Sequence, residues 1–419
     1  MHQKTVLDNG LRLLTSEMPH THSVSVVIFV GSGTCYETDA EAGISHFIEH
    51  LCFKGTSKRQ TAKEISEAIE GVGGILNGGT DKELTVLWCK VTSQHFKLAL
   101  DVLVDLIRNS RFDNKDIGRE RQVIIEEINM SLDSPQQRVD MLIDEILWPG
   151  QPLGRDSAGK KDVVAALTRQ QILGFFYKHY LPNNIVLSIA GDIKHEQASD
   201  IVNQYLGDWK PEKLPTYLTS TVQQVAPRLK IETRKTEQVN LCLGVPGLSI
   251  SHSDRFAMDL LSVILGEGMS SRLFVELREN KGIAYDIGSC SVHFRDSGAF
   301  FISAGVDSKR MGDALIAMLS QLGGLKDEIA DNELNRAKEL AKGRLLLAME
   351  DSRLVANWLG AQEILTERIL SVEEVVSHIE AVTTEDLLRV AQGLLVTEKL
   401  NLAVVGPVRN KDFVRLLRL

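Results

Sequence analysis

The sequence predicts an α+β protein with two similar domains, each a mainly antiparallel sheet covered by helices. Three observations support this fold class. The chain has 419 residues, which is too long for one hydrophobic core and fits two domains of about 200 residues each. Short β-branched stretches alternate with longer amphipathic stretches along the chain. This alternation restarts after a proline-containing segment, so the second half repeats the order of the first.

The first half begins with a turn at Asp8-Asn9-Gly10 between two short strands. A capping-box pattern at Thr61 and Glu64 marks the start of one later helix. From hydrophobic periodicity we expect further strands at 24–30, 83–91 and 185–190. We expect helices at 43–53, 61–71, 94–109, 114–130, 136–146, 168–179 and 196–205.

The second half is expected to repeat this order. The stretch 239–245 corresponds to the strand at 24–30, and 400–405, which also precedes a glycine, corresponds to the strand at 185–190. We expect its other elements to be a strand at 299–306 and helices at 255–265, 311–322 and 331–349. The predicted domains are therefore 1–210 and 228–419, joined by a linker at 211–227.

The stretch His46-Phe47-Ile48-Glu49-His50 carries the strongest chemical signal. In a helix, residues four apart leave one face a single turn apart, so both imidazoles can reach one zinc ion. Glu49 borders that face and can take a proton from metal-bound water. This H-x-x-E-H order predicts metal-assisted hydrolysis of peptide bonds. The alternative is an amphipathic helix with both histidines at its polar edge and Glu49 in solvent.

A catalytic zinc normally takes three protein ligands, and the helix expected at 114–130 offers the third. Glu120 and Glu127 share its apolar side, whereas Glu126 points to its polar side. That apolar side also carries Ile117, Val123, Ile124 and Ile128.

Carboxylates on a core-facing stripe are costly unless they are paired or bind a metal. We therefore predict Glu127 as the third ligand and Glu120 as a supporting carboxylate that holds a histidine ring N–H. The alternative is that both carboxylates pair with Arg119 or Arg121.

These residues resemble the pitrilysin/insulinase group of zinc peptidases, and most closely its mitochondrial-processing-peptidase-like branch. The resemblance covers nearly the whole chain. Beyond the motif and Glu127, it rests on the stretches 31–37, 53–56, 180–184, 189–192, 266–274 and 278–285. It implies the same roles for His46, His50, Glu49, Glu127 and Glu120 as those given above.

The resemblance also assigns residues that handle the substrate. It implies that Arg278 and Tyr285, in the C-terminal half, hold the substrate backbone or the developing oxyanion. Asn77 lies where relatives contact substrate, within a glycine-rich stretch at 73–79. That stretch predicts an exposed strand edge to which an extended peptide adds as another strand, and the alternative is an ordinary turn between helix and strand.

The function implied is that of a zinc-dependent endopeptidase, with one Zn²⁺ per chain, that hydrolyses extended peptides or presequence-like segments. A homodimer is expected, because the chain carries both the zinc residues and the Arg278/Tyr285 pair. One alternative is a catalytically silent peptide-binding or scaffold subunit of the same fold. Another is an interaction protein in which the histidine spacing is accidental.

Composition limits the other partners. A net charge of −9 argues against non-specific binding of nucleic acid. No stretch reaches the roughly 18 apolar residues of a membrane span, so no membrane insertion is expected. Five widely spaced cysteines indicate free thiols in a reducing compartment, which predicts a cytoplasmic protein. The first residues do not resemble a secretory signal, and a cleaved organelle presequence is the alternative.

Overall fold

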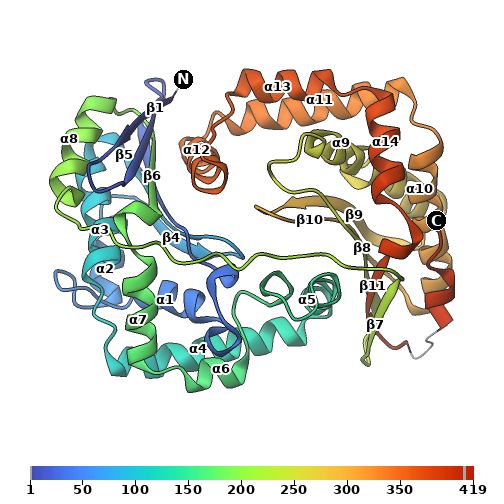
Figure 1. Ribbon diagram of the computed structural model, residues 1–419, viewed down its shortest axis with the longest axis horizontal. Helices are drawn as coiled ribbons and strands as arrows, with labels where there is room; N and C mark the ends of the chain where they lie inside the picture. The colour runs from blue at the N-terminus through green and yellow to red at the C-terminus, as the bar shows by residue number, and fades with distance from the viewer. Residues whose placement is uncertain (1, 409–411) are drawn as a thin grey trace. The chain divides into compact units, whose positions relative to one another are not determined.

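The computed structural model describes residues 2–408 and 412–419 (Figure 1). It confirms the predicted α+β class, because the chain forms two sheets that are covered by helices. Two compact units each contain one sheet. Unit 1 comprises Met1–Asn129, Asp156–Leu218 and Leu346–Ser371. Unit 2 comprises Met130–Arg155, Thr219–Leu345 and Val372–Leu419.

The sheet of unit 1 has six strands in the order β1-β2-β6-β3-β5-β4. β2 and β6 are parallel, and the other neighbours are antiparallel. All seven residues of β6 are buried, because both faces of the central strands are covered. The strands are β1 (His2–Val6), β2 (Arg12–Glu17), β3 (Ser23–Val30), β4 (Ile75–Thr80), β5 (Thr85–Thr92) and β6 (Ile185–Gly191).

The sheet of unit 2 has five strands in the order β7-β11-β8-β10-β9. Its first pair is parallel and the rest are antiparallel, as in the β2-β6-β3-β5-β4 part of the other sheet. β8 thus takes the place of β3, and β11 that of β6, as the internal repeat predicted. The strands are β7 (Arg228–Thr233), β8 (Gln238–Pro246), β9 (Ala284–His293), β10 (Gly298–Asp307) and β11 (Asn401–Gly406).

The helices surround both sheets (Figure 1). Those of unit 1 are α1 (Ile44–Cys52), α2 (Ala62–Glu70), α3 (Phe96–Asn109), most of α4 (Asn114–Asp133), α6 (Lys161–Ala166), α7 (Arg169–His179), α8 (His195–Leu206) and α12 (Ser352–Thr366). Those of unit 2 are α5 (Pro135–Leu147), α9 (Arg255–Gly266), α10 (Met311–Asp327), most of α11 (Asp331–Ala348), α13 (Val372–Ala381) and α14 (Thr384–Leu394). In the part of the chain that the structure describes, no helix has the length and apolar character needed to cross a bilayer.

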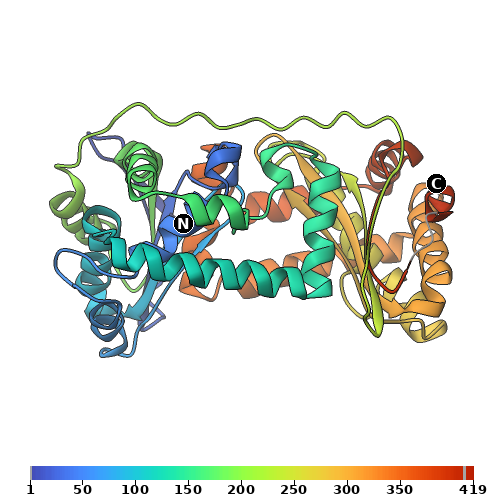
Figure 2. The same cartoon turned by 90° about the horizontal axis from the view of Figure 1, so that it is seen from below.

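The two halves of the sequence exchange one helix each. α12, from the second half, packs on β3 and β6 of unit 1, whereas α5, from the first half, packs on β11 and β8 of unit 2. The units therefore differ from a single division at 211–227, although that segment contains no helix or strand (Figure 2). The physical reason is that each central strand is apolar on both sides and needs a cover on its second face. In unit 1, Phe29 of β3 packs with Leu359 of α12 in one buried cluster.

Gly360 is the point of closest approach between α12 and the sheet, and it yields a stability prediction. A Cβ atom at Gly360 would overlap the buried ring of Phe29. Gly360→Ala should therefore lower the free energy of unfolding by about 1–3 kcal/mol. Gly343, in α11, has open space where a Cβ atom would lie. Gly343→Ala should therefore raise the free energy of unfolding by about 0.5–1 kcal/mol. Denaturant unfolding of both variants tests these two predictions. Equal changes in the free energy of unfolding would contradict the packing of α12 on the sheet.

Candidate metal centre

The helix that carries the H-x-x-E-H motif is anchored at its start. The buried carboxylate of Glu37 accepts hydrogen bonds from the backbone N–H groups of Gly43 and Ser45, each 2.9 Å long. A negative charge at this end of a helix is favoured by the helix dipole. Gly43 has a φ of 96°, and a Cβ there would lie 2.6 Å from the carbonyl oxygen of Ala158. Glycine is thus required where α1 begins.

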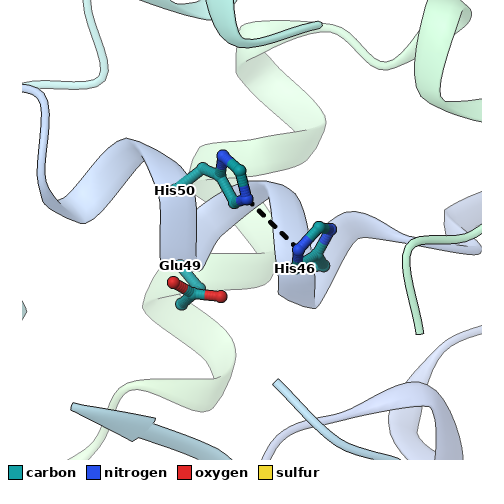
Figure 3. Close-up of side chains that lie close together, drawn as sticks. All are labelled: His46, Glu49 and His50. Atoms are coloured by element: carbon teal, nitrogen blue, oxygen red, sulfur yellow. Dashed lines mark hydrogen bonds between the residues drawn. The ribbon is translucent and has the colours of Figure 1, made fainter. Parts of the chain in front are cut away.

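His46 and His50 direct the same ring nitrogen toward each other (Figure 3). Their Nε2 atoms are 3.2 Å apart. Two nitrogens bound tetrahedrally to one zinc ion are about 3.3 Å apart, given the usual Zn–N length. Burial, with a smaller contribution from His50, lowers the pKa of His46 to about 4. His46 is therefore neutral at pH 7, which is the form that binds a metal.

Glu127 of α4 brings a third candidate ligand atom close to the two imidazoles. Its Oε2 atom lies 3.4 Å from Nε2 of His50 and 3.9 Å from Nε2 of His46. These two distances and the 3.2 Å between the nitrogens form a triangle. The point equidistant from its three corners lies about 2.0 Å from each atom, which is the length of a Zn–N or Zn–O bond. One point is thus at bonding distance from all three atoms. The residues present fit a zinc ion, and neighbouring Glu126 is exposed on the opposite side of α4.

Glu120 supports the histidine pair from behind. Its side chain is 7% exposed, and its Oε2 atom lies 3.2 Å from Nδ1 of His50. A carboxylate on this second ring nitrogen fixes the tautomer that leaves Nε2 free for a metal. The structure also places Lys54, for which the sequence predicted no role, 3.0 Å from the same oxygen.

The alternative pairing of the two carboxylates with arginines of α4 is wrong for the described residues. Arg119 lies 3.8 Å from Asp116, while Arg121 donates to the backbone carbonyls of Val164 and Leu167. The expectation that Val123 belongs to the apolar side is also wrong, because Val123 is 43% exposed.

Glu49 lies beside the three ligand atoms. One of its carboxylate oxygens and one nitrogen of each histidine all lie within 4.8 Å of one another. The side chain is largely buried, and this burial raises its pKa. A raised pKa suits a group that accepts a proton and later returns it. Thr80 donates a 3.4 Å hydrogen bond to its Oε2 atom, and a Cβ at Gly78 would lie 3.1 Å from its Oε1 atom.

A polar cavity of about 500 Å³ opens over these groups within unit 1. One wall is β4, which pairs with β5 at the end of the strand order and so forms an edge of the sheet among the described residues. The alternative of an ordinary turn is wrong for Ile75–Thr80, which is a strand. Asn77 of β4 is exposed and lines the cavity, and its Oδ1 atom accepts a 2.8 Å hydrogen bond from the N–H of Gly78.

Arg278 and Tyr285 belong to unit 2 and contact each other. The guanidinium of Arg278 lies 5.5 Å from the centre of the Tyr285 ring and 4.9 Å from that of Phe274. Both members of the pair are exposed, and Tyr285 is 76% exposed. Arg278 forms no ion pair with any residue that the structure describes. Both side chains are therefore open to a ligand.

The cysteines play no part in the centre. All five are free, and only Cys290 is exposed. Cys52 follows the motif by two positions, but its side chain is fully buried and burial raises its pKa. It is a protonated core thiol.

Two family models match the chain. The model described as "Insulinase (Peptidase family M16)" matches residues 12–161, and the one described as "Peptidase M16 inactive domain" matches residues 166–340. An uncharacterized zinc protease of Streptomyces coelicolor is 35% identical, over 99% of this chain and 91% of its own. The uncharacterized zinc protease YmxG of Bacillus subtilis is 33% identical, over 98% of this chain and 99% of its own.

Solved structures share the fold. A protease from Helicobacter pylori superposes with a TM-score of 0.92 at 22% identity, over 97% of this chain and 99% of its own. A structure from Pseudomonas fluorescens described as a peptidase M16 inactive domain superposes with a TM-score of 0.90 at 19% identity, over 97% and 98%. The matches to family models and to relatives over almost their whole length, together with this fold, show that the chain belongs to the insulinase family, peptidase family M16.

Proposed function

We propose that this protein is a zinc-dependent endopeptidase that cleaves extended peptides or presequence-like segments, with one zinc ion per chain. The observation that carries the proposal is the convergence of His46, His50 and Glu127 on one point, with the Glu49 carboxylate beside it. Membership of the family and the names of the relatives support a zinc protease.

Bound zinc would supply an activated water and a positive charge for the carbonyl oxygen of the substrate. Glu49 would accept the proton of that water on its carboxylate and pass it to the leaving amine. The edge of β4 would hold the peptide by main-chain hydrogen bonds, with Asn77 contacting it. Thr80 would keep the Glu49 carboxylate in place through its hydroxyl group.

The remaining assignments follow from the family resemblance. Arg278 and Tyr285 would bind the substrate backbone or the developing oxyanion, and their exposed, mutually stacked side chains support a binding role.

We further propose a homodimer. The five free cysteines support a reducing compartment such as the cytoplasm.

A catalytically silent subunit that binds peptides is the second candidate. The description of the model that matches residues 166–340 as inactive agrees with unit 2, where α9 takes the place of α1 without a histidine pair. In unit 1, by contrast, the histidine pair, Glu49 and Glu120 are largely buried, and burying such polar groups in a scaffold costs free energy unless they bind a metal.

The test is to purify the protein, measure bound zinc by mass spectrometry and identify cleavage sites in a peptide library. We expect about one zinc ion per chain and cleavage within peptides that stops when a chelator removes the metal. Zinc binding without any cleavage would favour the silent subunit. A protein that binds no zinc would be an interaction protein with accidental histidine spacing.

A further inference from the structure

Lys54 contacts the residue that orients His50. Its Nζ atom lies 3.0 Å from Oε2 of Glu120, and that same oxygen lies 3.2 Å from Nδ1 of His50. One carboxylate oxygen thus receives both an ammonium group and an imidazole N–H. The result is a chain of contacts that runs from Lys54 through Glu120 to His50.

The backbone around Lys54 is held rigidly. Its N–H donates a 3.1 Å hydrogen bond to the carbonyl of Leu51, which continues the last turn of α1. Two residues later, the fully buried Thr56 donates to the buried carboxylate of Asp105. These contacts fix where the Lys54 side chain starts, so its ammonium group reaches Glu120 at little cost in backbone entropy.

His50 is the better oriented of the two histidines. Nδ1 of His46 is buried and has no hydrogen-bond partner among the described residues. The His50 ring, by contrast, is held through its Nδ1 atom by the contact with Glu120. Glu120 is buried, and a buried carboxylate with only a neutral N–H as donor would turn toward water. Lys54 supplies the opposite charge that keeps it in place.

We propose that Lys54 is a positioning residue of the zinc site, which acts through Glu120 to hold the His50 imidazole in its metal-binding orientation. The proposal rests on the proposed function, because it takes His50 as a zinc ligand. Loss of a group that supports a metal ligand typically weakens metal binding by 10–100-fold. Lys54→Met should therefore raise the Kd for zinc about 10-fold. Lys54→Arg keeps the charge and should stay within about threefold of wild type.

The chain offers a matched control in the same segment. Lys58 pairs with Asp101 at 2.6 Å, and none of the contacts described for this pair involves a candidate ligand. Lys58→Met should leave the Kd for zinc unchanged.

A merely structural role of Lys54 is tested by combining Lys54→Met with Glu120→Gln. If Lys54 acts through Glu120, Lys54→Met should change the Kd by less than about twofold in the Glu120→Gln background.

The experiment is a competition between the purified full-length protein and a chelating dye for zinc, with Lys54→Gln as a second variant should Lys54→Met not fold. Wild-type affinity in both neutral variants would overturn the proposal while leaving the zinc site intact. An equal loss in the wild-type and Glu120→Gln backgrounds would also overturn it, since Lys54 would then act independently of Glu120. If the wild-type protein binds no zinc, the proposed function fails, and this proposal fails with it.

Discussion

Glu49→Gln is expected to abolish most peptide hydrolysis while zinc stays bound. The amide has the size of the carboxylate but cannot take a proton from water, so kcat should fall by roughly 10²–10⁴-fold. Glu49 is not one of the three converging ligand groups, so the Kd for zinc should remain close to that of wild type. The measurement is kcat on one peptide from the cleavage library, together with zinc content of the same preparation.

The control for Glu49→Gln is the thermal unfolding of both zinc-loaded proteins, which should agree closely if the substitution changes only the chemistry. Undiminished hydrolysis in the variant would remove Glu49 from the mechanism. Loss of zinc together with activity would instead make Glu49 a ligand, since one of its oxygens lies within 4.8 Å of a nitrogen of each histidine.

The second large effect is expected from Glu127→Ala. This change removes one of three ligand groups and should raise the Kd for zinc by at least about 100-fold. Glu126→Ala is the matched control, because Glu126 is the adjacent residue on the opposite, exposed side of α4. It should leave both zinc binding and hydrolysis within about twofold of wild type, as is usual for surface substitutions.

Zinc competition on the two variants decides between these expectations. Equal zinc affinities of the Glu127→Ala and Glu126→Ala variants, or a larger loss of zinc affinity in Glu126→Ala, would show that Glu127 does not bind the metal. That result would also undermine the proposed mechanism, since two histidines alone do not make a catalytic zinc site.

Much of the site was predictable because its parts follow local rules. The spacing of His46 and His50 places them on one face of any helix, and the same periodicity places Glu120 and Glu127 together on α4. The equivalence of β3 with β8 and of β6 with β11 was likewise visible as repeated patterns along the chain.

Other elements were not predicted. α12 buries one face, but Ser352, Gly360 and Glu363 stand on that face, so its sequence shows no clear apolar stripe. β7 was missed because its residues are only partly buried, as expected of a strand at the edge of a sheet. The helices predicted from the sequence also do not include α13 and α14.

By itself, the sequence determined which polar groups share a helix: two imidazoles and the carboxylate of Glu49 on one, and the carboxylates of Glu120 and Glu127 on another. Only the tertiary structure decided which groups meet across long separations. It paired Glu120 with Lys54 rather than with an arginine of its own helix, and it moved α5 and α12 onto each other's sheets. The reason is that helical and strand periodicity are properties of neighbouring residues, whereas ion pairs and the covering of a sheet depend on contacts between segments far apart in the chain.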